Sequence, residues 1–168
     1  MDRLSFEAIY AEHFRFVWSS LRALGVPSPT LEDAAQDVFV VVHRRLPAFQ
    51  GQEHVRTWLF AIARRVASDH RRRRRSFEEL STAESILDKR PSPHDVTARN
   101  EAVQLLERAL EGLDEHHREV FVLMDLAELR ANEVAEILSI NVNTVYSRLG
   151  RARERFNEIV ARLVRSDR

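Results

Sequence analysis

The sequence contains no cysteine, and it has only four glycines and five prolines in 168 residues. The absence of cysteine excludes disulfide bonds, thiolate metal sites and thiol-based redox sensing. Few glycines and prolines predict long helices rather than many turns. No apolar run reaches the length that spans a bilayer, and the first residues, MDRLSFEAIY, do not resemble a signal peptide. We therefore expect a cytoplasmic protein without membrane insertion.

Sequence patterns that accompany catalysis are also missing. The seven histidines show no H-E-x-x-H or related metal spacing. Neither a glycine-rich phosphate loop nor a nucleophile elbow is present. We therefore predict that the protein is not an enzyme, that it has no catalytic residues, cofactor or metal site, and that it takes no small-molecule substrate.

The net charge is zero, but the charges are segregated along the chain. Residues 58–75 contain seven arginines and one acid, and residues 141–168 contain seven arginines and three acids. Residues 101–140 have the opposite balance, with ten acids and three arginines. Two separate basic blocks favour two contacts with a polyanion, although chance segregation of charge on solvated helix faces is the alternative for either block alone.

Apolar residues recur at steps of three and four along most of the chain, which is typical of amphipathic helices. Thr30 and Asp114 are the expected N-caps of two of them. The β-branched run in VFVVVHRR is also compatible with a strand, but its caps and length favour a buried helix face. Helices are predicted over residues 5–24, 31–46, 56–75, 97–111, 115–127, 131–138 and 142–164.

The predicted fold class is all-α, with two small helical domains joined by a flexible linker. The N-terminal domain is expected over residues 1–75 and the C-terminal domain over residues 97–168. Between them, residues 76–96 are polar and mildly acidic with scattered apolar side chains, which is typical of a tether.

The segment ANEVAEILSINVNTVYSRLGRAR predicts a helix-turn-helix in the C-terminal domain. Residues 139–141 form the expected turn, and Asn141 is expected to cap the second helix. Such a helix enters the major groove by its N-terminus, where short polar side chains reach base edges and later arginines meet phosphates. A plain helical hairpin with a solvated charged tail is the alternative, and the turn lacks the glycine that many such motifs use.

In the first domain, TWLFAIARRVASDHRRRRR interleaves aromatic residues with arginines. Arginine neutralises backbone phosphates, and aromatic faces stack on unpaired bases. Leu59, Ile62 and Val66 are expected to be core residues, whereas Trp58 fits either a core position or a base contact.

Three blocks of the sequence, in the same order, resemble bacterial extracytoplasmic-function (ECF) RNA polymerase sigma factors of the sigma-70 superfamily. LEDAAQDVFVVVHRRLPAF resembles the family's D-x-x-Q-[DE]-x-F helix. FQGQEHVRTWLFAIARRVASDHRRRRR resembles the loop, T-W-L-x-x-I-A helix and basic tail that follow it. LDEHHREVFVLMDLAELRANEVAEILSINVNTVYSRLGRARERF resembles the promoter-reading domain, including T-V-x-S-R-L-x-R-A-R.

The resemblance implies that the chain binds core RNA polymerase and promoter DNA, melts the −10 element with its first domain and reads the −35 element with its second. It also implies regulation by an anti-sigma factor, and a linker that threads through the polymerase. A stand-alone helix-turn-helix regulator that binds duplex operator DNA is the alternative function.

The resemblance also assigns site residues. For core polymerase binding these are Asp33, Gln36, Asp37 and Phe39, with a core position as the alternative for Phe39. For the −10 element they are Phe49, Arg56, Trp58, Arg64, Arg65, Arg71 and Arg72. For the −35 element they are Asn141, Asn143, Thr144, Tyr146, Ser147, Arg148 and Arg151.

Three positions depart from the family pattern. Arg65 stands where many members have Asn, Tyr146 where many have Lys or Arg, and Gly150 where a larger side chain is common. These departures are expected to change the sequence that is read.

Overall fold

The structure is a computed structural model of the chain, and it describes residues 5–51, 54–80 and 98–166. All of the regular structure in these residues is helical, which confirms the predicted all-α class. The longer helices are α1 (Phe6–Ala23), α2 (Leu31–Arg45), α3 (Val55–Leu80), α4 (Ala98–Glu111), α5 (Glu115–Phe121), α6 (Ala131–Leu138) and α7 (Val142–Ser166).

The first three helices pack around one apolar core. Ser5 caps α1 by accepting a hydrogen bond from the backbone N–H of Ala8 at 3.1 Å. Gly25 follows the helix with φ +90°, a backbone conformation that side-chain-bearing residues rarely adopt. Thr30 is the N-cap residue of α2 as predicted, but its side chain makes no capping hydrogen bond. Thr30 ends a short 3₁₀ turn, Ser28–Thr30, and its hydroxyl donates to the carbonyl of Pro27 at 3.2 Å.

Helix α3 is longer than the sequence predicted. It continues through residues 76–80, five residues beyond the expected end of the N-terminal domain. An exposed ion pair between Arg74 and Glu78, with 2.8 Å between N and O, connects two successive turns of this extension. The rest of the predicted linker, residues 81–96, lies outside the described residues.

The remaining helices form the second half of the chain. Asp114 caps α5 as predicted, since its carboxylate accepts from the N–H of His117 at 3.1 Å. The helix expected to run to residue 127 is interrupted, because a π-helical turn, Val122–Leu126, follows α5. Within this turn the N–H of Ala127 donates to the carbonyl of Val122 at 2.8 Å.

The helix-turn-helix is formed by α6 and α7. Ser139 takes the left-handed conformation, with φ 53°, at the position where many such motifs have glycine. The N–H of Ile140 then donates to the carbonyl of Ala135 at 3.0 Å, which closes the turn. Asn141 caps α7, because its side-chain oxygen accepts from the N–H of Asn143 at 2.8 Å.

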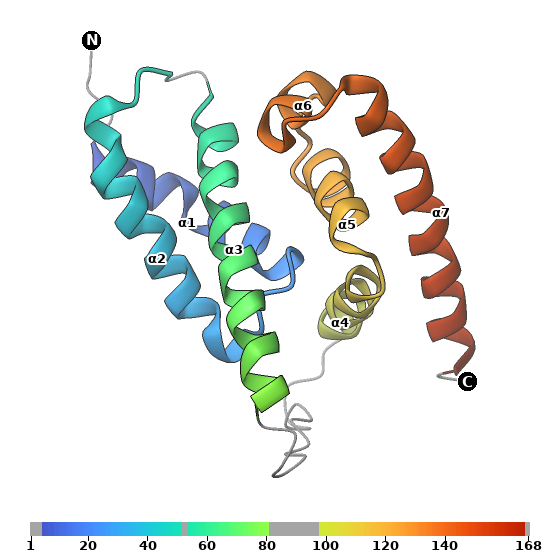
Figure 1. Cartoon of the computed structure of the whole chain (residues 1–168). Coiled ribbons are helices and arrows are strands. Elements are labelled where there is room, and N and C mark those ends of the chain that lie inside the picture. Colours follow the sequence, from blue (N-terminus) through green and yellow to red (C-terminus); the bar gives the residue numbers. More distant parts are fainter. Residues whose placement is uncertain (1–4, 52–53, 81–97, 167–168) are drawn as a thin grey trace.

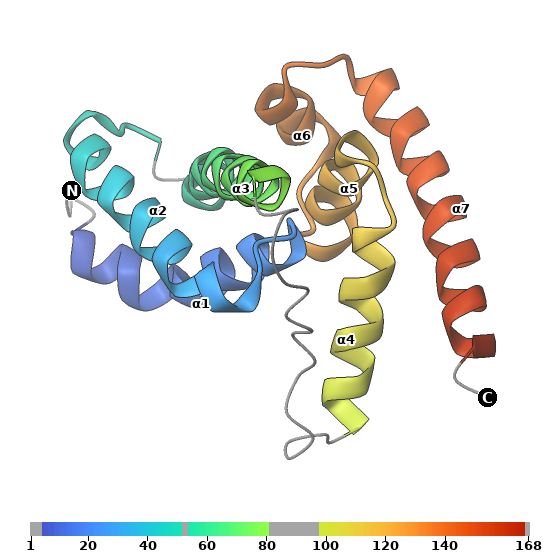
Figure 2. The ribbon, with the colours of Figure 1, turned by 60° about the horizontal axis from the view of Figure 1, so that its bottom comes forward.

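The two halves of the chain lie against each other. Helix α1 contacts α4, and α3 contacts α6, so both α1 and α3 border the C-terminal half (Figure 1; Figure 2). Helix α7 packs on α4, α5 and α6 and occupies the side of the molecule remote from α1–α3 (Figure 1). No helix in the described part of the chain is both long and apolar enough to cross a membrane.

Candidate nucleic-acid and polymerase interfaces

The N-terminal turns of α7 present an exposed polar surface. Val145 and Leu149 are buried against the rest of the domain, which fixes the orientation of the helix. Asn141, Asn143, Tyr146, Ser147 and Arg151 are exposed, and Thr144 and Arg148 are half-buried. The predicted −35 residues therefore lie together at one end of one helix, around backbone N–H groups that have no partner within the helix.

The arginines of α7 divide into two groups. Arg153 binds Asp125 with two hydrogen bonds of 2.6 and 2.8 Å, and Arg155 binds Glu158 at 3.1 Å. Arg148 and Arg151 pair with no carboxylate in residues 5–51, 54–80 and 98–166. The two cations nearest the start of α7 are thus available to a phosphate backbone.

A stacked aromatic pair lies at the start of α3. The rings of Phe49 and Trp58 are 4.2 Å apart between centroids, with 21° between their planes, and both residues are half-buried. Arg56 is exposed, and its guanidinium carbon lies 4.5 Å from the ring centroid of Phe16. Trp58 packs on the core cluster while part of it remains accessible, so its contact with a base stays a prediction.

The arginines of α3 face different surroundings. Arg65 and Arg72 are exposed, with 75% of the Arg72 side chain accessible. By contrast, Arg71 is buried, with 9% exposed, and it donates to the carbonyl of Leu24 and, at 2.5 Å, to Glu115. Arg64 donates to both carboxylate oxygens of Glu119, at 2.7 and 3.1 Å. Two of the residues predicted to bind the −10 element are therefore engaged by the C-terminal half.

These ion pairs belong to a seam between the two halves. Arg22 of α1 binds Glu107 of α4. Thr57 donates to Glu133 of α6 at 3.1 Å. The N–H of Arg130 also donates to Glu133, and this hydrogen bond is the main reason why the pKa of Glu133 lies below its ordinary value.

Burial of Arg118 at the same seam lowers the pKa of its guanidinium, and the neighbouring cation of Arg71 lowers it further. Its head group donates to the carbonyls of Leu110, Glu111 and Leu113 at 2.8–3.1 Å. A Cβ on Gly25 would lie 2.6 Å from Nη1 of Arg118, so a side chain there would displace this guanidinium in addition to straining the backbone at φ +90°.

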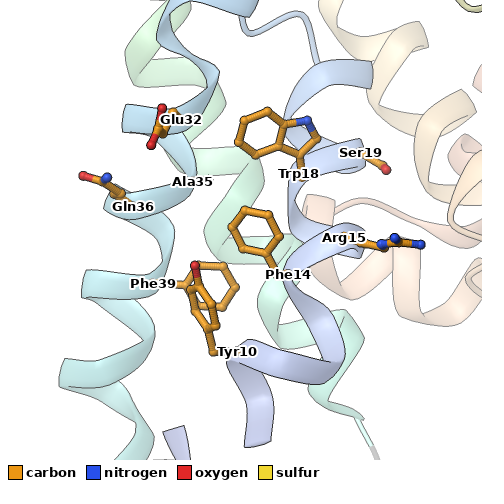
Figure 3. A pocket seen from close by; sticks show the side chains of 9 residues that line it. All are labelled: Tyr10, Phe14, Arg15, Trp18, Ser19, Glu32, Ala35, Gln36 and Phe39. Atoms are coloured by element: carbon orange, nitrogen blue, oxygen red, sulfur yellow. The ribbon is translucent and has the colours of Figure 1, made fainter. Parts of the chain in front are cut away.

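A groove of about 630 Å³ runs between α1 and α2 (Figure 3). One wall carries Tyr10, Phe14 and Trp18, at four-residue spacing along α1. Gln36 and Phe39 face them from α2. Four-residue spacing of aromatic residues is visible in the sequence and could have identified the α1 wall, which was not assigned to any partner from the sequence.

The predicted polymerase-binding residues of α2 share one helix but differ in exposure. Asp33, Gln36 and Asp37 are exposed, whereas Phe39 is 4% exposed. The ring of Phe39 packs 4.7 Å from that of Tyr10 and forms the floor of the groove, which agrees with its alternative role as a core residue. Asp37 is bound by His70 of α3 at 2.8 Å. No group of three or more His, Cys, Asp or Glu side chains in the described ranges is arranged to hold a metal ion.

Comparisons with known proteins identify both halves of the chain. Residues 9–77 match the family described as Sigma-70 region 2, and residues 103–156 match Sigma-70, region 4. The chain is 30% identical to the RNA polymerase sigma factor YlaC of Bacillus subtilis, over 90% of this chain and 89% of YlaC. It is 32% identical to the ECF RNA polymerase sigma-E factor of Escherichia coli, over 88% of this chain and 82% of that protein.

Solved structures agree with these matches. The structure of CnrH in complex with the cytosolic domain of CnrY is similar with a TM-score of 0.68 and 26% identity, over 97% of this chain and 89% of CnrH. The fold also resembles the sigma factor RpoE of Bartonella quintana, solved in complex with the anti-sigma factor NepR, with a TM-score of 0.75 and 22% identity over 93% of this chain and 96% of RpoE. The helix-turn-helix, the basic α3 and the order of the two matched regions lead to one conclusion: the chain belongs to the ECF sigma factors of the sigma-70 family.

Proposed function

We propose that this sigma factor binds core RNA polymerase in the cytoplasm, melts the −10 element with its N-terminal half and reads the −35 element with its C-terminal half. The observation that carries the proposal is that both sigma-70 regions occur in order in one chain, and that each has an exposed surface suited to its role. The protein acts by directing the polymerase and not as an enzyme itself.

The −35 contact is assigned to the N-terminal turns of α7. Asn143 and Ser147 are short, polar and exposed, so they can reach base edges in a major groove. Tyr146 adds a large exposed surface, with 57% accessible. Arg148 and Arg151 follow at the distance along the helix where the flanking phosphates lie.

The −10 contact is assigned to the stacked pair Phe49–Trp58 and the exposed cations around it. Turning a base out of the duplex costs a few kcal/mol, which stacking and hydrogen bonds in the pocket must offset. Base stacking on an aromatic ring supplies about 1–3 kcal/mol per base. Arg56, Arg65 and Arg72 are exposed and can neutralise phosphates of the separated strand.

The polymerase contact is assigned to the α1–α2 groove and the exposed face of α2. An aromatic wall with Asp33, Gln36 and Asp37 at its edge suits a helical partner that is partly apolar and basic. Because Phe39 is buried, its role is to support the wall through ring contacts with Tyr10 and Phe14. We extend the site to Tyr10, Phe14 and Trp18.

We also propose that an anti-sigma factor regulates this chain. Support comes from the related structures, in which CnrH is bound to the cytosolic domain of CnrY and RpoE to NepR.

Run-off transcription tests the proposal. The purified chain is mixed with core RNA polymerase and a library of promoter fragments, with no other sigma factor present. Discrete transcripts that share upstream elements near −35 and −10 are expected. Absence of both transcripts and core binding would overturn the proposal, and tight binding to duplex operator DNA in that case would favour a stand-alone regulator.

Two variants test the polymerase-binding surface and the −35 surface independently of each other. Phe14→Ala opens the aromatic wall and is expected to weaken core binding while leaving duplex −35 binding by the C-terminal half unchanged. Arg151→Ala is expected to have the opposite effect, and Arg162→Ala, an exposed arginine three turns further along α7, serves as its control.

A further inference from the structure

We propose that the acidic residues of α4, α5 and α6 form an intramolecular latch that holds the promoter-binding face of α3 closed in the free protein. The proposal rests on the function assigned above, because it takes α3 to be the helix that meets the −10 strand. The first part of the latch is formed by three ion pairs between the halves: Arg22–Glu107, Arg64–Glu119 and Arg71–Glu115.

Glu119 is the centre of the latch. It is 2% exposed, and both of its carboxylate oxygens are used by the guanidinium of Arg64. A paired fork of this kind is among the strongest ion-pair geometries, whereas a buried carboxylate without a partner is strongly disfavoured. The burial of Glu119 therefore depends on Arg64, and separating the two groups favours exposure of Glu119 to water.

The second part of the latch lies at the start of α3. Thr57 donates to Glu133 of α6 at 3.1 Å, and His54 lies 3.7 Å from the same carboxylate. These contacts hold α6 against the first turn of α3, the turn that also carries Trp58. Figure 2 shows α6 and α5 next to α3 along one side.

The latch explains how a cation can serve two partners in turn. A phosphate and a carboxylate compete for the same guanidinium, so Arg64 bound to Glu119 is withheld from the promoter strand. Arg65 and Arg72 remain exposed in the closed form and can make the first encounter with DNA. Opening of the halves then releases Arg64 from Glu119 and the first turn of α3 from α6.

The test uses fluorescence energy transfer between the halves, since the chain has no cysteine of its own. Ala48→Cys and Ala161→Cys place dyes at two exposed positions, one in each half. Glu119→Gln removes the central charge, and Glu107→Gln with Glu115→Gln removes two partly exposed charges with little risk to folding.

The matched control is Asp125→Asn. It breaks the ion pair with Arg153, which has a comparable two-bond geometry but lies within the C-terminal half. High transfer is expected for the unmodified sequence and for the control. Transfer is expected to fall in both latch variants, and to return in the charge-swapped chain Arg64→Glu/Glu119→Arg.

Binding of a fluorescent single-stranded oligonucleotide by the same variants gives the second readout. Glu119→Gln is expected to bind several-fold more tightly than the unmodified sequence, with a salt slope steeper by about 0.7 for each further phosphate that the chain neutralises. Equal transfer in the unmodified chain and both latch variants would overturn the latch. Neither readout uses polymerase, so this result leaves the transcription assay as an independent test of the sigma function.

Discussion

Arg71 is the first of five consecutive arginines, and nothing in the sequence distinguishes it from the other four. Its burial in the structure therefore predicts an effect of substitution that the sequence alone does not. Replacing it by alanine removes a donor to the carbonyl of Leu24 and an ion pair with Glu115. Hydrogen bonds that involve a charged group stabilise a fold by about 1.5–3 kcal/mol. The pair with Glu115, whose side chain is 43% exposed, adds at most about 1 kcal/mol.

We therefore expect Arg71→Ala to lower the free energy of unfolding by about 2–4 kcal/mol, out of the roughly 5–15 kcal/mol typical of a domain. Arg72→Ala is the control. Its side chain is 75% exposed and lies 3.4 Å from Asp69, so the expected loss stays below about 0.5 kcal/mol.

Urea unfolding followed by tryptophan fluorescence measures this difference. Both tryptophans, Trp18 and Trp58, lie in the N-terminal half, so the signal reports the part of the chain that Arg71 and Leu24 share. With a slope of about 1–3 kcal/mol per molar urea, the midpoint for Arg71→Ala falls by roughly 0.7–4 M.

In oligonucleotide binding, Arg72→Ala is expected to have a larger effect than Arg71→Ala, the reverse of their effects on stability. Arg72→Ala reduces the salt slope by about 0.7, because one phosphate is no longer neutralised, whereas Arg71→Ala removes no exposed cation and does not reduce the slope. Equal urea midpoints for the two variants, or a larger loss of unfolding free energy in Arg72→Ala, would refute the claim that burial makes Arg71 a structural residue.

Three other predictions follow from single sites. Gly150→Ala is expected to raise the free energy of unfolding by about 0.5–1 kcal/mol in thermal denaturation, because a Cβ there meets nothing within 4 Å and glycine weakens a helix interior. Glu133→Gln is expected to make the free energy of unfolding less dependent on pH in the acid range. The Arg130 N–H lowers the pKa of Glu133 in the folded chain, so this carboxylate stabilises the fold above its ordinary pKa of 4.5. That stabilisation is lost as the pH falls through the lower pKa of the folded state. Trp58→Ala is expected to reduce open-complex formation, measured by permanganate footprinting, with core binding retained; loss of core binding as well would contradict the separation of the two surfaces.

The helices were predictable because their signals are local. Apolar periodicity and caps such as Asp114 and Asn141 depend on neighbours within one or two turns, and the structure confirms these two caps. The features that the sequence did not predict are also local, but they leave a weaker pattern in the sequence. Thr30 stands at the predicted N-cap position, but its hydroxyl donates to the carbonyl of Pro27 and makes no capping hydrogen bond. The π-helical turn after α5 leaves no mark in the apolar pattern.

Exposure of the site residues was only partly predictable. The outward face of α7 follows from its buried Val145 and Leu149, so the predicted −35 residues share one surface. The arginines of α3 differ for a reason that periodicity on one helix cannot supply. Whether Arg64 and Arg71 face water depends on a second domain, and nothing in residues 58–75 specifies where that domain lies.

The same limit explains why Glu119 went unnoticed. It is one of ten acids in residues 101–140, and the sequence shows only that this block opposes the basic ones in sign. In the folded chain, three of these acids form ion pairs with arginines of the N-terminal half. The zero net charge therefore partly reflects direct pairing between the two halves, since some of the arginines are neutralised within the molecule. A chain of this kind attracts polyanions less strongly than its basic blocks suggest, and the proposed latch predicts that its affinity for DNA rises when the halves separate.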